Sequence, residues 1–347
     1  MSDRVLASCS DRLCQVNSTI STFNHESLEL LVRKFRENSI SLEKILPLLH
    51  VFKESDKENL AREAQRDKLF REKWFQMLTF ICDLFNSQGI QYTLIKILDY
   101  PYARMSDLDI LILDPLEELK AVEQLANKGF KIFGFRLLAH PLKIMALKIN
   151  DSNPKVCVDF YPAPAWIRKK VCDAEVIFHR TRIADVSGIK VAVPSSEDSF
   201  YLVGTHAYNH LRFTLAEILH GLNEIHENFD WEYLFNLAVS YGTADAIYLY
   251  LKLLDTYSKK FRCYSSIPEH IFKPYAKFKI CRHIDSWFEG SLRILEFPVH
   301  VPTGIGCIYS STYHCITIRP HLSISDLLYD FLTHYLTLFS KAILNKT

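Results

Sequence analysis

Residues 106–113 read SDLDILIL, an acidic start followed by an unbroken apolar run. Such a run without alternation is typical of a strand that is buried on both faces of a sheet. Because side chains i and i+2 of a strand lie on one face, we expect Asp107 and Asp109 side by side, about 7 Å apart at Cα. Adjacent carboxylates next to a buried strand are costly without a cation. The pair therefore predicts a site for a hard divalent ion such as Mg²⁺, which takes oxygen ligands.

A third acid lies in residues 156–161, which read VCVDFY. The alternation places the apolar residues on one face of a strand and Asp159 on the other. If this strand neighbours the first, Asp107, Asp109 and Asp159 converge, and two divalent ions there could hold the attacking and leaving oxygens of a phosphoryl transfer. Two plainer alternatives stay open: the paired acids oppose edge pairing at a solvated strand end, and Asp159 is a hydrogen-bonded residue near a turn.

The surrounding pattern predicts an α+β fold, a small mixed β-sheet core flanked by an N-terminal helical segment and a C-terminal helical domain. Besides the two segments above, strands are expected at 92–98, 130–137, 143–149, 176–183 and 190–193, and a helix at 115–128. The predicted divisions are a helical region 1–87, the core 88–194, a helical domain 195–260 and a mixed region 261–347, with strand-like fragments at 292–301 and 307–318 and an amphipathic helix at 324–344.

Composition and charge narrow the classes of function. The 347 residues include 41 Lys and Arg against 40 Asp and Glu, so the chain has no overall field that attracts nucleic acid or an anionic membrane. The nine cysteines are scattered and never spaced C-x-x-C, which favours reduced thiols in a cytoplasmic protein. No apolar segment is long enough to span a membrane, and residues 1–17 do not resemble a secretory signal. Walker A, G-x-G-x-x-G and G-x-S-x-G motifs are absent.

Several segments together resemble a known family. They are YTLIKI (92–97), YPYARMSDLDILI (100–112), NKGF (127–130), VDFY (158–161) and VPSSED (193–198), the last followed by a helix that carries histidines. Over about residues 88–255 the chain resembles the uncharacterised nucleotidyltransferase-like proteins of the polymerase-beta superfold. The resemblance implies transfer of a nucleotidyl group from an NTP to a hydroxyl acceptor. It implies that Asp107 and Asp109 bind two Mg²⁺ ions, and that Asp159 helps to bind one ion and activates the acceptor oxygen.

The chain departs from this pattern at one motif. The superfold usually has a Gly-Gly or Gly-Ser pair about ten residues before the first acid, where small residues let backbone N–H groups approach the triphosphate. Here Lys96 and Ile97 occupy that place. Lys96 could neutralise a phosphate, with Arg104 and Ser106 as further donors, or it could be a strand-end lysine that reaches solvent. The missing glycine also leaves a second hypothesis, a catalytically silent binding or regulatory module.

Two further features have both a functional and a plain interpretation. His206 and His210 share one face of the predicted helix, but Ala207 replaces the general-base Glu of a zinc protease. They are expected either as a packed, hydrogen-bonded pair or as substrate or phosphate contacts. Residues 258–283 combine seven Lys and Arg with aromatic residues, which suits either nucleic acid or a solvated helix face.

Overall fold

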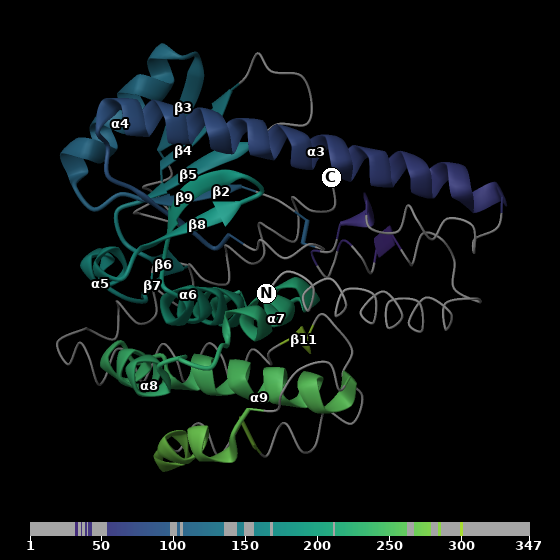
Figure 1. Ribbon diagram of the computed structural model, residues 1–347, viewed down its shortest axis with the longest axis vertical. Coiled ribbons are helices and arrows are strands. Elements are labelled where there is room, and N and C mark those ends of the chain that lie inside the picture. The colour runs from purple at the N-terminus through teal and green to yellow at the C-terminus, as the bar shows by residue number, and fades with distance from the viewer. Residues whose placement is uncertain are drawn as a thin grey trace, which may run out of the picture.

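The computed structural model describes residues 54–97, 107–134, 144–148, 156–166, 169–210, 212–261 and 267–278, with the short pieces 32–33, 36, 39, 41–43, 103–104, 284–285 and 299–300. Within these residues the chain has a mixed α+β architecture (Figure 1). The strand predictions at 307–318 and the helix prediction at 324–344 lie outside the described residues, as does most of 1–53.

A five-stranded sheet forms the centre of the α+β part, in the order β1-β2-β5-β4-β3. Its strands are β1 (Thr93–Ile95), β2 (Leu108–Leu111), β3 (Phe130–Gly134), β4 (Ile144–Lys148) and β5 (Cys157–Tyr161). The central neighbours β2 and β5 are parallel, and the other three pairings are antiparallel. The sheet is therefore mixed, as expected, and its two acid-bearing strands are neighbours.

The two faces of the sheet contact different apolar clusters. On β2 and β5, the even-numbered side chains Ile110 and Phe160 join the cluster of α3 (Glu54–Gln88) and α4 (Pro115–Asn127). The odd-numbered Leu111 and Tyr161 join the cluster of the C-terminal helices. Asp109 and Asp159 are odd-numbered too, so the period of two places them on the face toward those helices.

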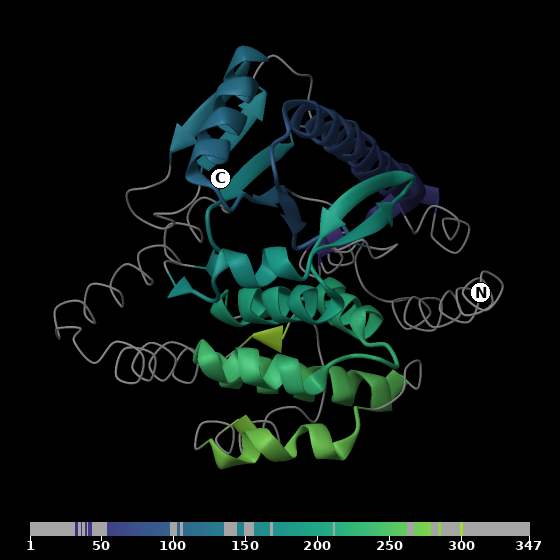
Figure 2. The ribbon, with the colours of Figure 1, turned by 60° about the vertical axis from the view of Figure 1, so that its left-hand side comes forward.

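The C-terminal helices stack beneath the sheet in the views of Figures 1 and 2. They are α6 (Ser196–Asn209), α7 (Leu215–Glu224), α8 (Trp231–Ser240) and α9 (Ala244–Phe261), followed by the 3-10 turns η2 (Glu269–Ile271) and η3 (Lys273–Lys277). Between α6 and α7, β10 (Arg212–Phe213) pairs with β11 (Val299–His300), which follows η3 in the chain. Helix α6 begins as the sequence predicts, because Ser195 caps it by accepting from the Asp198 N–H. This helix supplies side chains to the candidate site.

One strand prediction in the core is wrong. Residues 176–183 were expected as a strand, but α5 (Ala174–His179) occupies most of them, and the strand β8 (Arg182–Val186) starts only afterwards. Asp173 holds the extended N-cap conformation and Glu175 lies in the first turn, where negative charge favours a helix.

Two further two-stranded antiparallel pairs are formed by β6 (Ala165–Trp166) with β7 (Lys169–Lys170), and by β8 with β9 (Ile189–Val193).

The other strand predictions within 92–161 are confirmed, each by a strand inside the predicted range, and the prediction at 190–193 is confirmed by β9, which begins one residue earlier. Helices are confirmed at 115–128 and across most of 195–260. None of the helices in the described part of the chain is long and apolar enough to cross a membrane.

Candidate functional site

Two of the predicted acids meet at the centre of the sheet. Asp109 and Asp159 are direct partners in the parallel register of β2 and β5, and they are 9% and 1% exposed. Asp107 precedes β2 and is exposed, and its carbonyl oxygen accepts a 3.4 Å hydrogen bond from the Trp74 indole of α3. Helix α3 thus fixes the backbone where the acidic segment enters the sheet.

Lys96 brings a positive charge to these acids. Its Nζ lies 2.9 Å from Oδ1 of Asp109, and the lysine side chain is only 12% exposed. Lys96 directly follows β1, in which Ile95 pairs with Asp109. The backbone of Lys96 has φ +57°, a left-handed conformation that costs a residue with a Cβ about 1 kcal/mol and normally favours glycine. The lysine side chain lies against Asp109 and is largely shielded from solvent, so it is not a strand-end lysine that reaches solvent.

Two aromatic rings complete the surroundings of this ammonium. Nζ of Lys96 lies 4.7 Å from the ring centroid of Trp166 and 5.3 Å from that of Tyr161, within the range of cation–π attraction. Burial raises the pKa of Tyr161 well above its ordinary value, and the charges of Asp109 and Asp159 raise it further. The Tyr161 hydroxyl thus stays protonated beside the acids.

The helical layer contributes a buried acid and two histidines. Glu217 of α7 is 3.6 Å from Nδ1 of His206, and the His206 ring lies 4.4 Å from that of His210 and 5.2 Å from that of Trp166. Burial raises the pKa of Glu217, although hydrogen bonds from Thr214 and the charges of Arg212 and, more weakly, Lys96 lower it. The Trp166 ring, which packs against His206, thus joins this group to the ammonium of Lys96.

The predicted phosphate donors have different positions. The guanidinium of Arg104 forms a 3.3 Å ion pair with Asp67 of α3, which also accepts from the Leu42 N–H. The structure thus directs Arg104 to α3. Ser106 lies outside the described residues. Of the three predicted donors, Lys96 is the one that the structure brings to the acids.

The residues present have the right chemistry for Mg²⁺, but they are not arranged as a finished metal site. Carboxylate oxygens are the ligands that Mg²⁺ prefers, and Asp109 and Asp159 present them from adjacent strands. Across the part of the chain that the structure describes, no three His, Cys, Asp or Glu side chains are grouped closely enough to hold a metal. The cation that contacts Asp109 is the ammonium of Lys96. A metal at Oδ1 of Asp109 would therefore compete with this ammonium.

Three residues of the site were missed from sequence. Tyr161 could have been found, because it lies two residues after Asp159 and so shares its face of β5. Trp166 and Glu217 come to the site only through tertiary packing. The capping box of Thr214 and Glu217 is visible in sequence, but it predicts the start of a helix and no site.

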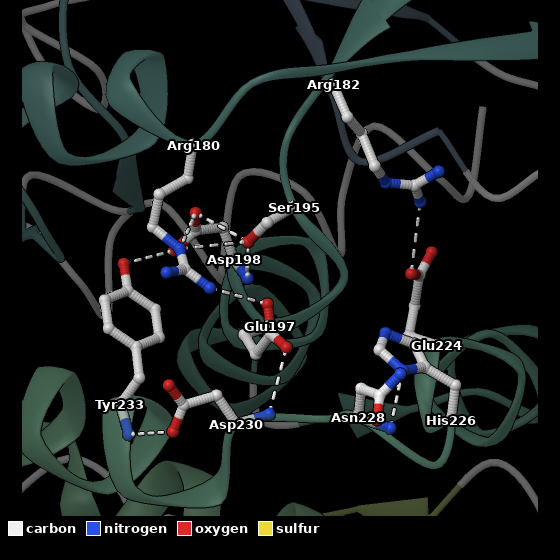
Figure 3. Close-up of polar contacts among 10 residues, drawn as sticks. All are labelled: Arg180, Arg182, Ser195, Glu197, Asp198, Glu224, His226, Asn228, Asp230 and Tyr233. Carbon is white, nitrogen blue, oxygen red and sulfur yellow. Dashed lines mark hydrogen bonds and ion pairs between the residues drawn. The ribbon is translucent and has the colours of Figure 1, made fainter.

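A second charged cluster lies at the other end of α6 (Figure 3). Arg180 donates to Glu197 at 2.8 Å, approaches Asp198 at 3.5 Å and lies 3.8 Å from the centroid of the Tyr233 ring. Asp198 also accepts from the Tyr233 hydroxyl at 2.6 Å, and Glu197 accepts from the Asp230 N–H at 3.0 Å. These contacts join the segment after α5 to the start of α6 and of α8, which indicates a structural role.

No family model matches the chain, and no curated protein is similar enough to count as a relative. Its function is therefore inferred from the geometry of the site.

Proposed function

We propose that this protein is a Mg²⁺-dependent nucleotidyltransferase that moves a nucleotidyl group from an NTP to a hydroxyl acceptor. The observation that carries the proposal is the register of Asp109 with Asp159 on two parallel central strands. Asp107 lies directly before β2, two residues from Asp109, and is the third acid that the proposal uses. Two buried acids side by side are costly, and such costs are concentrated at functional sites.

The site residues predicted from sequence have separate roles in this proposal. Asp107, Asp109 and Asp159 would hold two Mg²⁺ ions, which supply charge stabilisation to the attacking and leaving oxygens when bound. Asp159 orients the acceptor hydroxyl and favours its deprotonation. Lys96 neutralises a phosphate of the NTP. His206 and His210 contact the substrate from the helical layer.

The proposal includes a reducing, cytoplasmic location and no membrane partner. Cys82, Cys157 and Cys172 are free thiols, in keeping with the scattered cysteine pattern. In the described part of the basic region 258–283, Tyr275 is buried and Lys277 packs over the rings of Phe235 and Phe278. Nucleic acid is therefore not the acceptor that we favour. These contacts favour a folded helix face.

The direct test is label transfer. The purified protein is incubated with each α-labelled NTP, Mg²⁺ and cell extract, and compared with Asp107→Ala and with Asp83→Ala, an exposed acid of α3. We expect transfer with at least one NTP, its loss in Asp107→Ala and its retention in Asp83→Ala. Transfer that survives Asp107→Ala would exclude the mechanism.

A second candidate is a catalytically silent module that keeps the fold without productive triphosphate binding. The ion pair of Lys96 with Asp109 favours it, because the lysine already neutralises an acid that a metal would need. Thermal melting with Mg²⁺ and each NTP separates the two, since a ligand of the folded form must raise the midpoint. A flat response to all four NTPs would favour the silent module.

A further inference from the structure

The surroundings of the Lys96 ammonium have the features of a cation-binding site. A carboxylate oxygen of Asp109 contacts it at 2.9 Å, and the rings of Trp166 and Tyr161 lie 4.7 and 5.3 Å away. Aromatic faces carry negative charge density, and a carboxylate gives a charge-assisted hydrogen bond. The chain therefore supplies its own cation to the place where the proposed function needs a metal.

The backbone conformation at Lys96 is one that normally favours glycine. At φ +57° a glycine is the least strained residue, yet the position carries a lysine. Its side chain reaches back over the sheet face that carries the acids, and it is nearly as buried as that of Asp109, 12% against 11% exposed. The pairing of a long cationic side chain with Asp109 offsets the cost of a strained backbone.

The lysine also has a second acid within electrostatic range. The Trp166 ring over which the Lys96 ammonium lies also packs against His206, and His206 is 3.6 Å from Glu217 of the helical layer. The charges of Arg212 and, more weakly, of Lys96 lower the pKa of Glu217. If the Lys96 ammonium moved away from Asp109, the carboxylate of Glu217 would still be nearby. This makes the ion pair with Asp109 replaceable at a cost smaller than that of stranding a buried charge.

We propose that Lys96 is an internal competitor for the divalent cation at Asp109, so that a metal binds only by displacing the lysine. The inference rests on the proposed function, because it takes the acids to be metal ligands. It adds a regulatory property of the same site: the free metal binds weakly to the resting protein, and a triphosphate that attracts the released ammonium favours metal entry.

The test measures binding of Mn²⁺ alone, as the loss of the electron paramagnetic resonance signal of the free ion. The wild type is compared with Lys96→Met and Lys96→Gln, which remove the charge, and with Lys96→Arg, which keeps it. We expect both uncharged variants to bind Mn²⁺ about tenfold more tightly, because no charge-assisted hydrogen bond must be broken, and Lys96→Arg to bind like the wild type. Circular dichroism checks that each variant is folded, and either uncharged variant is sufficient for the test.

Equal or weaker Mn²⁺ binding by the uncharged variants would overturn the inference, as would tight binding by all four proteins or by none. Failure of this inference can be distinguished from failure of the proposed function. Tighter Mn²⁺ binding by Lys96→Met, with no label transfer by the wild type with any NTP, would support competition between Lys96 and the metal but contradict the proposed enzymatic function. Label transfer by the wild type, with unchanged Mn²⁺ affinity in Lys96→Met, would support the proposed enzymatic function but contradict competition between Lys96 and the metal.

Discussion

Helix α6 carries a charged cluster near each end, and the two are built differently. At its start, the acids Glu197 and Asp198 face donors, namely the guanidinium of Arg180, a tyrosine hydroxyl and a backbone N–H. Near its other end, His206 packs against the Trp166 ring, over which the Lys96 ammonium also lies. That ammonium contacts Asp109, the register partner of Asp159. Hydrogen-bond donors offset the cost of burying an acid, whereas two neighbouring carboxylates raise that cost unless a cation lies beside them. At the first cluster an arginine, a hydroxyl and a backbone N–H hold the two acids, which indicates a structural role. At the second, a single lysine ammonium lies beside carboxylates from two neighbouring strands, and this cluster is the candidate site.

The largest expected effect is on activity. Asp159→Asn keeps the shape of the side chain but removes one carboxylate, and we expect label transfer to fall by about 10²–10³-fold, the scale of losing one preorganised charge-stabilising group. Stability should be unchanged or slightly higher, because a like charge beside Asp109 disappears. Transfer rates and urea unfolding measure both. A clear loss of stability with transfer retained would place Asp159 with the structural acids.

The next effect is on stability. Arg180→Ala leaves two acids that are 7% and 0% exposed without their guanidinium. Because Arg180 is itself 35% exposed, we expect a loss of about 2 kcal/mol in the free energy of unfolding, less than for a fully buried pair. Urea denaturation gives the value. A change below about 0.5 kcal/mol would show that this cluster does not hold the helices together.

A smaller effect concerns pH. Burial raises the pKa of Asp198 to about 6, although Tyr233, Ser195 and Arg180 act to lower it. Because the folded pKa exceeds the unfolded one, the folded state binds this proton more tightly, and the contribution is full below about pH 4 and lost as the pH rises through 6. Relative to Asp198→Asn, the wild type should therefore be about 2 kcal/mol more stable near pH 4 than near pH 7.

The pH effect is measured by denaturation of both proteins at the two pH values. The comparison cancels the titration of groups that the two proteins share, including Glu197, whose pKa is lowered in the folded state. The same stability difference at both pH values would show that Asp198 stays ionised throughout.

The smallest expected effect on stability is that of Arg182→Ala, the control for Arg180→Ala. Arg182 forms an ion pair with Glu224 (Figure 3), in which the two atoms are 3.4 Å apart and the arginine side chain is 47% exposed. An exposed pair is screened by water, so Arg182→Ala should cost about 0.5 kcal/mol or less. This variant controls for the loss of an arginine in Arg180→Ala. Equal losses in both would remove the distinction between a buried and an exposed cluster.

Local patterns predicted much of the fold. The apolar run after Asp109 and the alternation around Asp159 are properties of single strands, and both strands form where expected. The strand prediction at 176–183 is wrong because Ala174 and Ile177 bury one face of a short helix that Asp173 precedes as N-cap. A six-residue helix is too short to show a clear period in sequence.

The site was predictable in part. The face shared by the acids follows from the strand period, and their register follows once β2 and β5 are neighbours. The ion pair of Lys96 depends on a left-handed backbone at a residue that is not glycine, which no sequence pattern indicates. Glu217 and Trp166 arrive through packing between layers that are distant in sequence.

The most direct test of the central claim is a crystal structure with Mn²⁺ and a non-hydrolysable NTP, examined by anomalous diffraction. We predict an anomalous peak within about 2.5 Å of carboxylate oxygens of both Asp109 and Asp159, with the ammonium of Lys96 moved off Asp109. A bound nucleotide with no such peak, and Lys96 still paired with Asp109, would contradict the assignment of these acids as a metal site.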